Sequence, residues 1–133
     1  MKTDDPHFRP KPERITGLRH VFAATGYSLA GVRRLWNEAA FRHIVLAFAA
    51  CVVLLIGIGA SWSQVCIFLI LFLALVAAEA LNTAVECLVD HLAPDWQEFA
   101  RDAKDLGSLA TMCLLVANGL YLGTILFQHF DLI

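Results

Sequence analysis

Residues 44–78 read IVLAFAACVVLLIGIGASWSQVCIFLILFLALVAA, and this stretch decides the fold. Its 35 residues include no Asp, Glu, Lys, Arg or His, and a second such stretch of 23 residues runs from Leu106 to Gln128. A transmembrane helix needs about 20 residues of this kind. The sequence therefore predicts an all-α integral membrane protein.

The composition of the 133-residue chain agrees with this prediction. Hydrophobic residues make up 59% of the chain and charged residues 17%, whereas soluble domains average about 25% charged residues. An ordinary soluble enzyme, a nucleic-acid-binding protein and a disulfide-stabilised scaffold are excluded. The length allows one domain.

The first uncharged stretch is too long for a single crossing. As one helix it would extend about 52 Å, against a hydrocarbon core of about 30 Å. A turn is expected at Gly57, Gly59, Ser61, Ser63 and Gln64. We expect spans at about 39–60 and 64–91, a short link containing Pro94, and a third span at about 97–127, all within one membrane domain at 14–133.

The residues before the first span predict two further segments. Residues 1–13 are rich in proline and charge, which predicts a disordered tail. Residues 14–37 place apolar side chains three and four apart between flanking arginines, which predicts an amphipathic helix on the membrane surface. Eight of the ten Lys and Arg residues precede the first uncharged stretch, which begins at Ile44, so we expect a cytoplasmic N-terminus.

Acidic residues near the end of the second span form a polar stripe on an otherwise apolar helix. At about 100° per residue, Glu79, Glu86 and Asp90 lie within about 40° of one another, and Asn82 and Thr83 flank them. Ionisable groups at membrane depth are costly, so these residues need a role.

The third span opens with polar residues that also share a face. A hairpin through Pro94 would bring this face against the acidic stripe on the cytoplasmic side, and Glu38 would reach the same depth from the first span. The face consists of Arg101, Lys104, Asp105 and Ser108.

Spacing alone leaves three roles open for this cluster. The residues could join helices through polar contacts, form a proton or cation pathway, or hold a metal ion and a polyphosphate for catalysis. Periodicity does not identify a substrate.

Four stretches resemble the small bacterial integral-membrane diacylglycerol kinases. Residues 79–90 read EALNTAVECLVD and residues 103–108 read AKDLGS. Upstream, residues 24–31 read ATGYSLAG and residues 36–42 read WNEAAFR, in the same order and spacing as in that family. The resemblance covers about residues 17–127.

The resemblance implies a fold and an activity. It implies a homotrimer in the bacterial inner membrane, with a surface helix and three transmembrane helices in each chain and active sites formed between subunits. The implied reaction is phosphorylation of the diacylglycerol hydroxyl by ATP with Mg²⁺ to give phosphatidate, in phospholipid recycling.

The resemblance also implies roles for individual residues. Glu79 resembles the general base, and Glu38 and Glu86 resemble the carboxylates that hold the metal. Residues that match positions around the nucleotide and the reactants are Asn82, Lys104, Asp105 and Ser28.

The chain departs from the family pattern at two places. After Phe41-Arg42 the family commonly continues with Gln-Glu, whereas this chain has His43-Ile44, so an acid is missing while His43 retains a hydrogen-bond donor. The basic residue expected early in the surface helix corresponds to Arg19 only if the alignment shifts by one position.

Two alternative functions remain. The relative that phosphorylates undecaprenol shares the polar residues of both main motifs, and only the upstream stretches and Gly107-Ser108 favour diacylglycerol. A small proton-coupled transporter would account for the acidic stripe, but it gives no reason for the Lys104-Asp105 pair or for the amphipathic helix.

Overall fold

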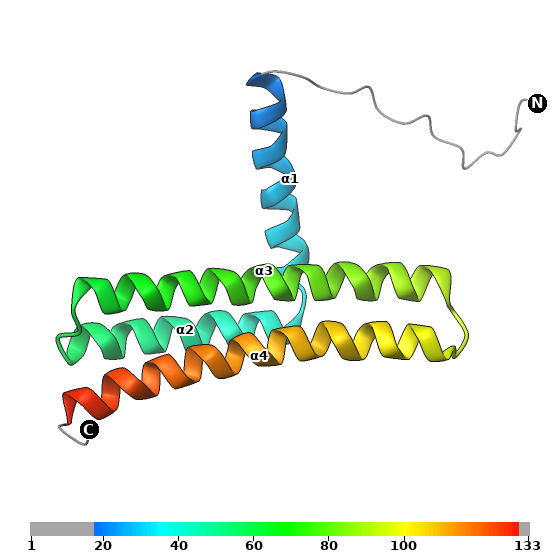
Figure 1. The fold of residues 1–133 in the computed structure, drawn as a ribbon. Helices are drawn as coiled ribbons and strands as arrows, with labels where there is room; N and C mark the ends of the chain where they lie inside the picture. The colour runs from blue at the N-terminus through cyan, green and yellow to red at the C-terminus, as the bar shows by residue number, and fades with distance from the viewer. Residues whose placement is uncertain (1–17, 131–133) are drawn as a thin grey trace, which may run out of the picture. The chain divides into compact units, whose positions relative to one another are not determined.

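The computed structural model describes residues 18–130, and the side chains from residue 24 onward. This part of the chain forms four α-helices and no strand (Figure 1): α1 (Leu18–Trp36), α2 (Ala39–Gly57), α3 (Trp62–Leu92) and α4 (Glu98–His129). The predicted all-α class is confirmed. The predicted disordered tail at 1–13 and the expected start of the first helix at 14–17 lie outside the described residues.

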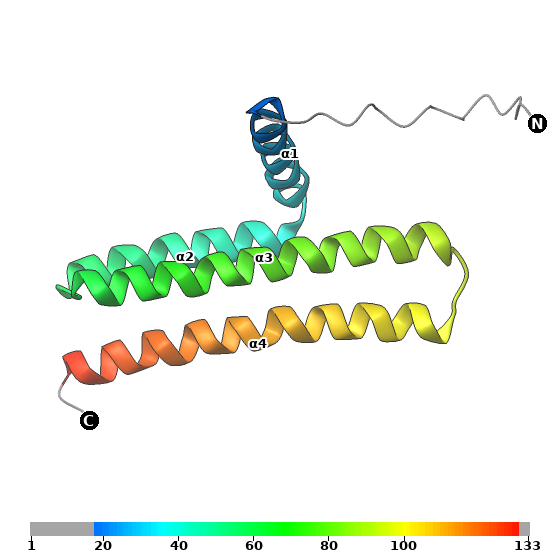
Figure 2. The same cartoon turned by 45° about the horizontal axis from the view of Figure 1, so that its top comes forward.

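The chain divides into two compact units between Val32 and Arg33. The first contains most of α1, in which the Ser28 hydroxyl donates to the carbonyl of Ala24 over 3.1 Å. The second contains the last turn of α1 and the three long helices. In Figures 1 and 2, α2, α3 and α4 lie side by side, each antiparallel to the next.

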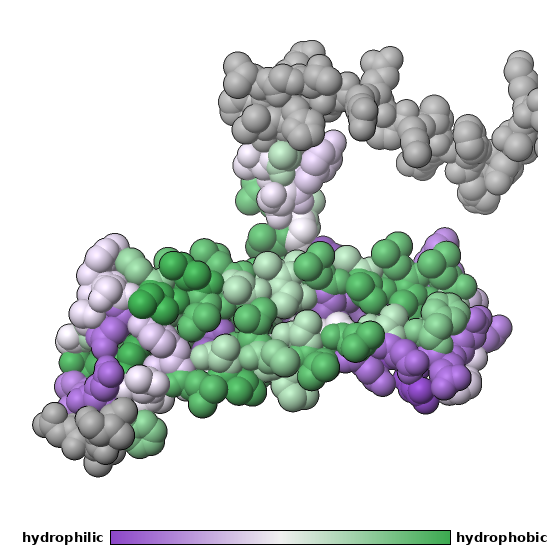
Figure 3. All heavy atoms as spheres, in the orientation of Figure 1, coloured by the Kyte–Doolittle hydropathy of each residue, from purple (hydrophilic) through white to green (hydrophobic). Residues whose placement is uncertain are grey.

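Three helices are long and apolar enough to cross a membrane, as predicted: α2, α3 and α4, with 19, 31 and 32 residues. At about 1.5 Å per residue, α2 matches a hydrocarbon core, whereas α3 exceeds it by about 16 Å. Figure 3 shows hydrophobic residues over the middle of this bundle and hydrophilic residues gathered at its two ends. The α3–α4 hairpin therefore has a polar end that extends beyond α2.

The turn between α2 and α3 is built by local backbone chemistry. Gly59 has a φ of +72°, a conformation that glycine adopts without steric cost. Ser61 begins α3 with a capping box, in which its hydroxyl accepts from the Gln64 N–H and the Gln64 side chain accepts from the Ser61 N–H. These two devices explain why α2 ends at Gly57, three residues earlier than expected.

The bundle has a small apolar core with one polar contact beside it. Leu55, Phe68 and Ile125 bring α2, α3 and α4 together in one buried cluster. The buried Asn118 of α4 donates to the Leu71 carbonyl of α3 over 3.1 Å and to the Leu114 carbonyl over 2.8 Å. Because an unpaired amide costs free energy in hydrocarbon, the contact to Leu71 favours this pairing of α3 and α4.

Candidate active site

A groove of about 460 Å³ opens between the start of α2, the second half of α3 and α4. Its polar wall is formed mainly by carboxylates and an amide, and its apolar wall includes Ile44 of α2. The polar lining residues are Glu38, Glu79, Asn82, Thr83, Glu86, Ser108 and Thr111. The structure thus brings the predicted acids of α3 together with Glu38, as the sequence indicates.

Glu79 is the most enclosed acid of the groove. It is 7% exposed, and it makes no hydrogen bond or ion pair with any residue that the structure describes. A buried carboxyl group without a partner is costly. The Glu79 carboxylate oxygens are not among the fully buried unpaired atoms of the described chain, so they open into the groove, where a ligand can reach them.

Asn82 and Glu86 form a hydrogen-bonded pair one turn apart on α3. The Asn82 Nδ2 donates to the Glu86 Oε1 over 3.0 Å. The other end of the amide, Oδ1, is buried and accepts no hydrogen bond from the described residues. The amide therefore fixes one oxygen of Glu86 and keeps an unused acceptor of its own.

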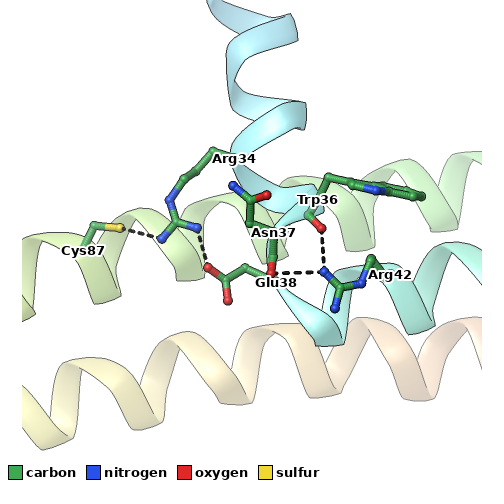
Figure 4. Close-up of polar contacts among 6 residues, drawn as sticks. All are labelled: Arg34, Trp36, Asn37, Glu38, Arg42 and Cys87. Atoms are coloured by element: carbon green, nitrogen blue, oxygen red, sulfur yellow. Dashed lines mark hydrogen bonds and ion pairs between the residues drawn. The ribbon is translucent and has the colours of Figure 1, made fainter.

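Glu38 lies at the connection between α1 and α2 and is held by Arg34. It precedes α2 with an extended backbone, and its side chain does not cap the helix. In Figure 4, Arg34 lies between Glu38 and the Cys87 thiol of α3, with Nη2 3.7 Å from Sγ. The hydrogen bond to Glu38, followed by that to Cys87, raises the pKa of Arg34.

The same connection is held by a second arginine. Arg42 of α2 donates to the carbonyls of Trp36 and Asn37 over 3.0 and 3.2 Å (Figure 4). Carbonyls at the end of α1 lack partners within the helix, so these bonds complete them. The connection that carries Glu38 is thereby held by an arginine from each of the two helices.

Lys104 and Asp105 lie in a neighbouring groove beside the α3–α4 link, rather than in the groove of Glu79. Lys104 forms an ion pair with Asp90 across the hairpin. The prediction that the hairpin brings the two polar faces together is supported by this contact. Within one chain, however, Lys104 and Asp105 line one groove. The carboxylates of Glu38, Glu79 and Glu86 line the other.

The remaining predicted residues belong to α1 and to the start of α2. Ser28 is exposed on α1, in the first compact unit, and His43 is exposed on α2. Arg19 belongs to α1, but its side chain lies outside the described side chains.

Arg34 contacts a residue of the groove, although the sequence predicts no role for it. Its spacing of four residues from Glu38 is the spacing at which opposite charges meet on a helix, and this signal could have indicated it. The contact to Cys87 joins residues 53 positions apart, which no local pattern predicts.

No three Asp, Glu, His or Cys side chains in the described chain lie close enough to hold a metal ion by themselves. The groove instead offers carboxylate, amide and hydroxyl oxygens. Oxygen donors suit hard cations, and Mg²⁺ is commonly held by one or two carboxylates together with substrate phosphates. This donor set fits a metal that arrives with a phosphate ligand.

Comparison with known proteins identifies the family. A sequence profile described as prokaryotic diacylglycerol kinase matches residues 26–126. The chain belongs to this family. The matched residues include the whole groove and the hairpin beside it.

Individual members of the prokaryotic diacylglycerol kinase family align over most of their length. The chain is 52% identical to a diacylglycerol kinase of Sinorhizobium sp over 109 residues, covering 82% of this chain and 80% of the relative. It is 36% identical to that of Haemophilus influenzae, covering 86% and 98%, and 30% identical to that of Escherichia coli K12, covering 86% and 95%. Membership makes this chain a lipid kinase with a nucleotide co-substrate.

Proposed function

We propose that this chain transfers the γ-phosphate of ATP to the free hydroxyl of 1,2-diacylglycerol and so forms phosphatidate. The observation that carries the proposal is the buried Glu79, which has no partner among the described residues and lines a groove with Asn82 and Glu86. Membership of the prokaryotic diacylglycerol kinase family and the names of the relatives support the choice of reaction.

Glu79 acts as the general base. A lipid hydroxyl is a weak nucleophile, so removal of its proton as its oxygen attacks the γ-phosphorus accelerates the step. The proton passes to the Glu79 carboxylate, a new P–O bond forms to the lipid oxygen, and the bond to the β-phosphate oxygen breaks to release ADP.

Glu38 and Glu86 hold Mg²⁺ together with the nucleotide phosphates. When bound, the cation neutralises the charge of the β- and γ-phosphates. Asn82 fixes the orientation of Glu86 through the 3.0 Å hydrogen bond. Arg34 keeps Glu38 at the groove mouth.

The remaining predicted residues contact the nucleotide or the lipid from outside the groove. Lys104 offsets phosphate charge and Asp105 orients the reactants, while Ser28, His43 and Arg19 contribute from α1 and the start of α2.

We infer that the active protein is a homotrimer in the bacterial inner membrane, with a cytoplasmic N-terminus and sites shared between subunits. Each of the three long helices leaves large apolar side chains exposed, among them Val53 of α2, Ile70 of α3 and Leu120 of α4. Lipid covers part of this surface and neighbouring chains cover the rest. Lys104 already interacts electrostatically with Glu86 of its own chain, and shared sites would set it beside the Glu79 groove of a neighbour.

One assay tests the reaction and both alternatives. Purified protein in mixed micelles receives ATP labelled in the γ-phosphate, with diacylglycerol or undecaprenol as the acceptor. We expect labelled phosphatidate. Faster labelling of undecaprenol would instead favour the related lipid kinase. Proton flux in liposomes without any labelled lipid would favour a transporter.

A further inference from the structure

Gly107 of α4 faces the side chain of Asn82 on α3 at very short range. A Cβ atom at position 107 would collide with the Asn82 Oδ1 and lie 3.2 Å from its Cγ. The colliding atoms belong to a side chain and not to the helix backbone. Any residue other than glycine at this position would therefore have to displace the Asn82 amide.

Backbone conformation does not explain a glycine at this position. Gly59 is the glycine with positive φ in the described chain, whereas Gly107 lies inside α4. Glycine in a helix interior costs about 1 kcal/mol relative to alanine. Gly119 and Gly123 of the same helix have open space where a Cβ would stand, whereas at Gly107 that space is taken by the Asn82 amide.

The Asn82 amide is hydrogen-bonded at one end and enclosed at the other. Its Nδ2 donates to Glu86, and its Oδ1 is buried against the place where a Cβ would stand. Rotation of the side chain away from α4 would carry Nδ2 away from the Glu86 carboxylate. A change at position 107 would thus reach an acid of the groove that it does not touch.

We propose that Gly107 is a positioning residue of the active site. By lacking a side chain, it lets the Asn82 amide lie between α3 and α4 and hold Glu86 at the groove wall. This inference rests on the proposed function, in which Glu86 serves phosphoryl transfer. Gly107 itself touches neither substrate.

Four variants isolate this contact: Gly107→Ala, Asn82→Ala, the double variant and the control Gly119→Ala. The control adds the same methyl group to the same helix, where it meets nothing within 4 Å. In the double variant the new methyl group fits, because the Asn82 Cα at 3.6 Å is an ordinary van der Waals neighbour.

The initial rate of phosphatidate formation gives the first result. We expect Gly107→Ala to slow the reaction at least about tenfold and Gly119→Ala to stay within about twofold of wild type. If Gly107 acts through Asn82, the two changes are not additive, and the double variant is no slower than Asn82→Ala. A double variant whose loss is the product of the two single losses would overturn the proposal.

The side-chain amide signal of Asn82 gives a second result that does not depend on activity. In protein labelled with ¹⁵N-asparagine, this signal is the one that Asn82→Ala removes. We expect it to shift in Gly107→Ala and to stay in place in Gly119→Ala. An unchanged signal in Gly107→Ala would contradict the contact, even if wild-type protein phosphorylated no lipid and the proposed function failed.

Folding is followed by thermal unfolding of all four variants. Should Gly107→Ala fail to fold, the double variant decides. Recovery of the fold with the turnover of Asn82→Ala supports the proposal, because removing the amide has removed the collision. Failure of the double variant to fold would overturn it.

Discussion

Lys104 of α4 donates to Asp90 of α3, with 2.5 Å between Nζ and Oδ1. The pair closes the hairpin beside the link, yet the two side chains remain 41% and 66% exposed. An exposed ion pair contributes about 0–1 kcal/mol to stability. Stability alone therefore gives little reason for a lysine at this position.

The two partners of this pair should differ sharply when changed. Lys104→Met and Asp90→Asn both remove the same ion pair, so both should lower the thermal unfolding midpoint slightly. If Lys104 contacts phosphate, its loss should slow lipid phosphorylation by about 10²–10³-fold, as expected for losing one donor to the transition state. Asp90→Asn should stay within about threefold of wild type. Equal losses of rate in the two variants would limit Lys104 to a structural role.

Ile44 lies in the groove wall with Glu38 and Glu79, at the position where the family pattern commonly has an acid. Ile44→Glu should place another carboxylate in the groove and strengthen its hold on a cation. The Mg²⁺ concentration for half-maximal rate should fall. Ile44→Gln, which has nearly the same shape without the charge, is the control. An equal or higher requirement in Ile44→Glu would refute the idea.

Mixed oligomers should recover activity if sites are shared. Glu79 and Lys104 line separate grooves within one chain. Inactive Glu79→Gln and Lys104→Met subunits, once mixed, should build some sites that contain both original side chains. The activity of the mixture should exceed the sum of the separate activities. If two affinity tags show that subunits have exchanged and the mixture still gains no activity, the result would argue against shared sites.

The Ser61 cap should matter for stability and not for catalysis. Ser61→Ala removes the hydroxyl that accepts from the Gln64 N–H at the start of α3. The groove of Glu79 is lined by the second half of this helix. The expected cost is about 1 kcal/mol, seen as a lower thermal midpoint with unchanged turnover. Ser63→Ala is the matched control, because the Ser63 hydroxyl contacts only the Ser61 hydroxyl. A similar fall in both variants would speak against the capping box.

The helices could be predicted because their signals are local. Long uncharged stretches define α2, α3 and α4, and the acids of α3 share a face through the helical repeat alone. The proximity of Glu38 to those acids was also predictable, because the start of the first span lies at the same membrane depth as the acidic end of the second. These signals need no knowledge of how side chains pack.

The unpredicted features depend on packing between distant residues. The sequence does not show that Lys104 pairs with Asp90 away from the Glu79 groove, or that Arg34 reaches Cys87. The collision that excludes a side chain at Gly107 depends on the rotamer of Asn82. Such contacts are decided by the spacing of helices to within an ångström or two, which residue patterns do not encode.

The most direct test of the account compares the Mg²⁺ dependence of phosphatidate formation in Glu79→Gln and Glu86→Gln. Glu79→Gln removes the proton acceptor, so its rate should fall by about 10²–10⁴-fold at every Mg²⁺ concentration. Glu86→Gln removes a metal ligand, and additional Mg²⁺ should restore part of its rate by mass action. Near-normal turnover of Glu79→Gln in a protein that melts early, or rescue of that variant by Mg²⁺, would contradict the assignment of Glu79 as the base.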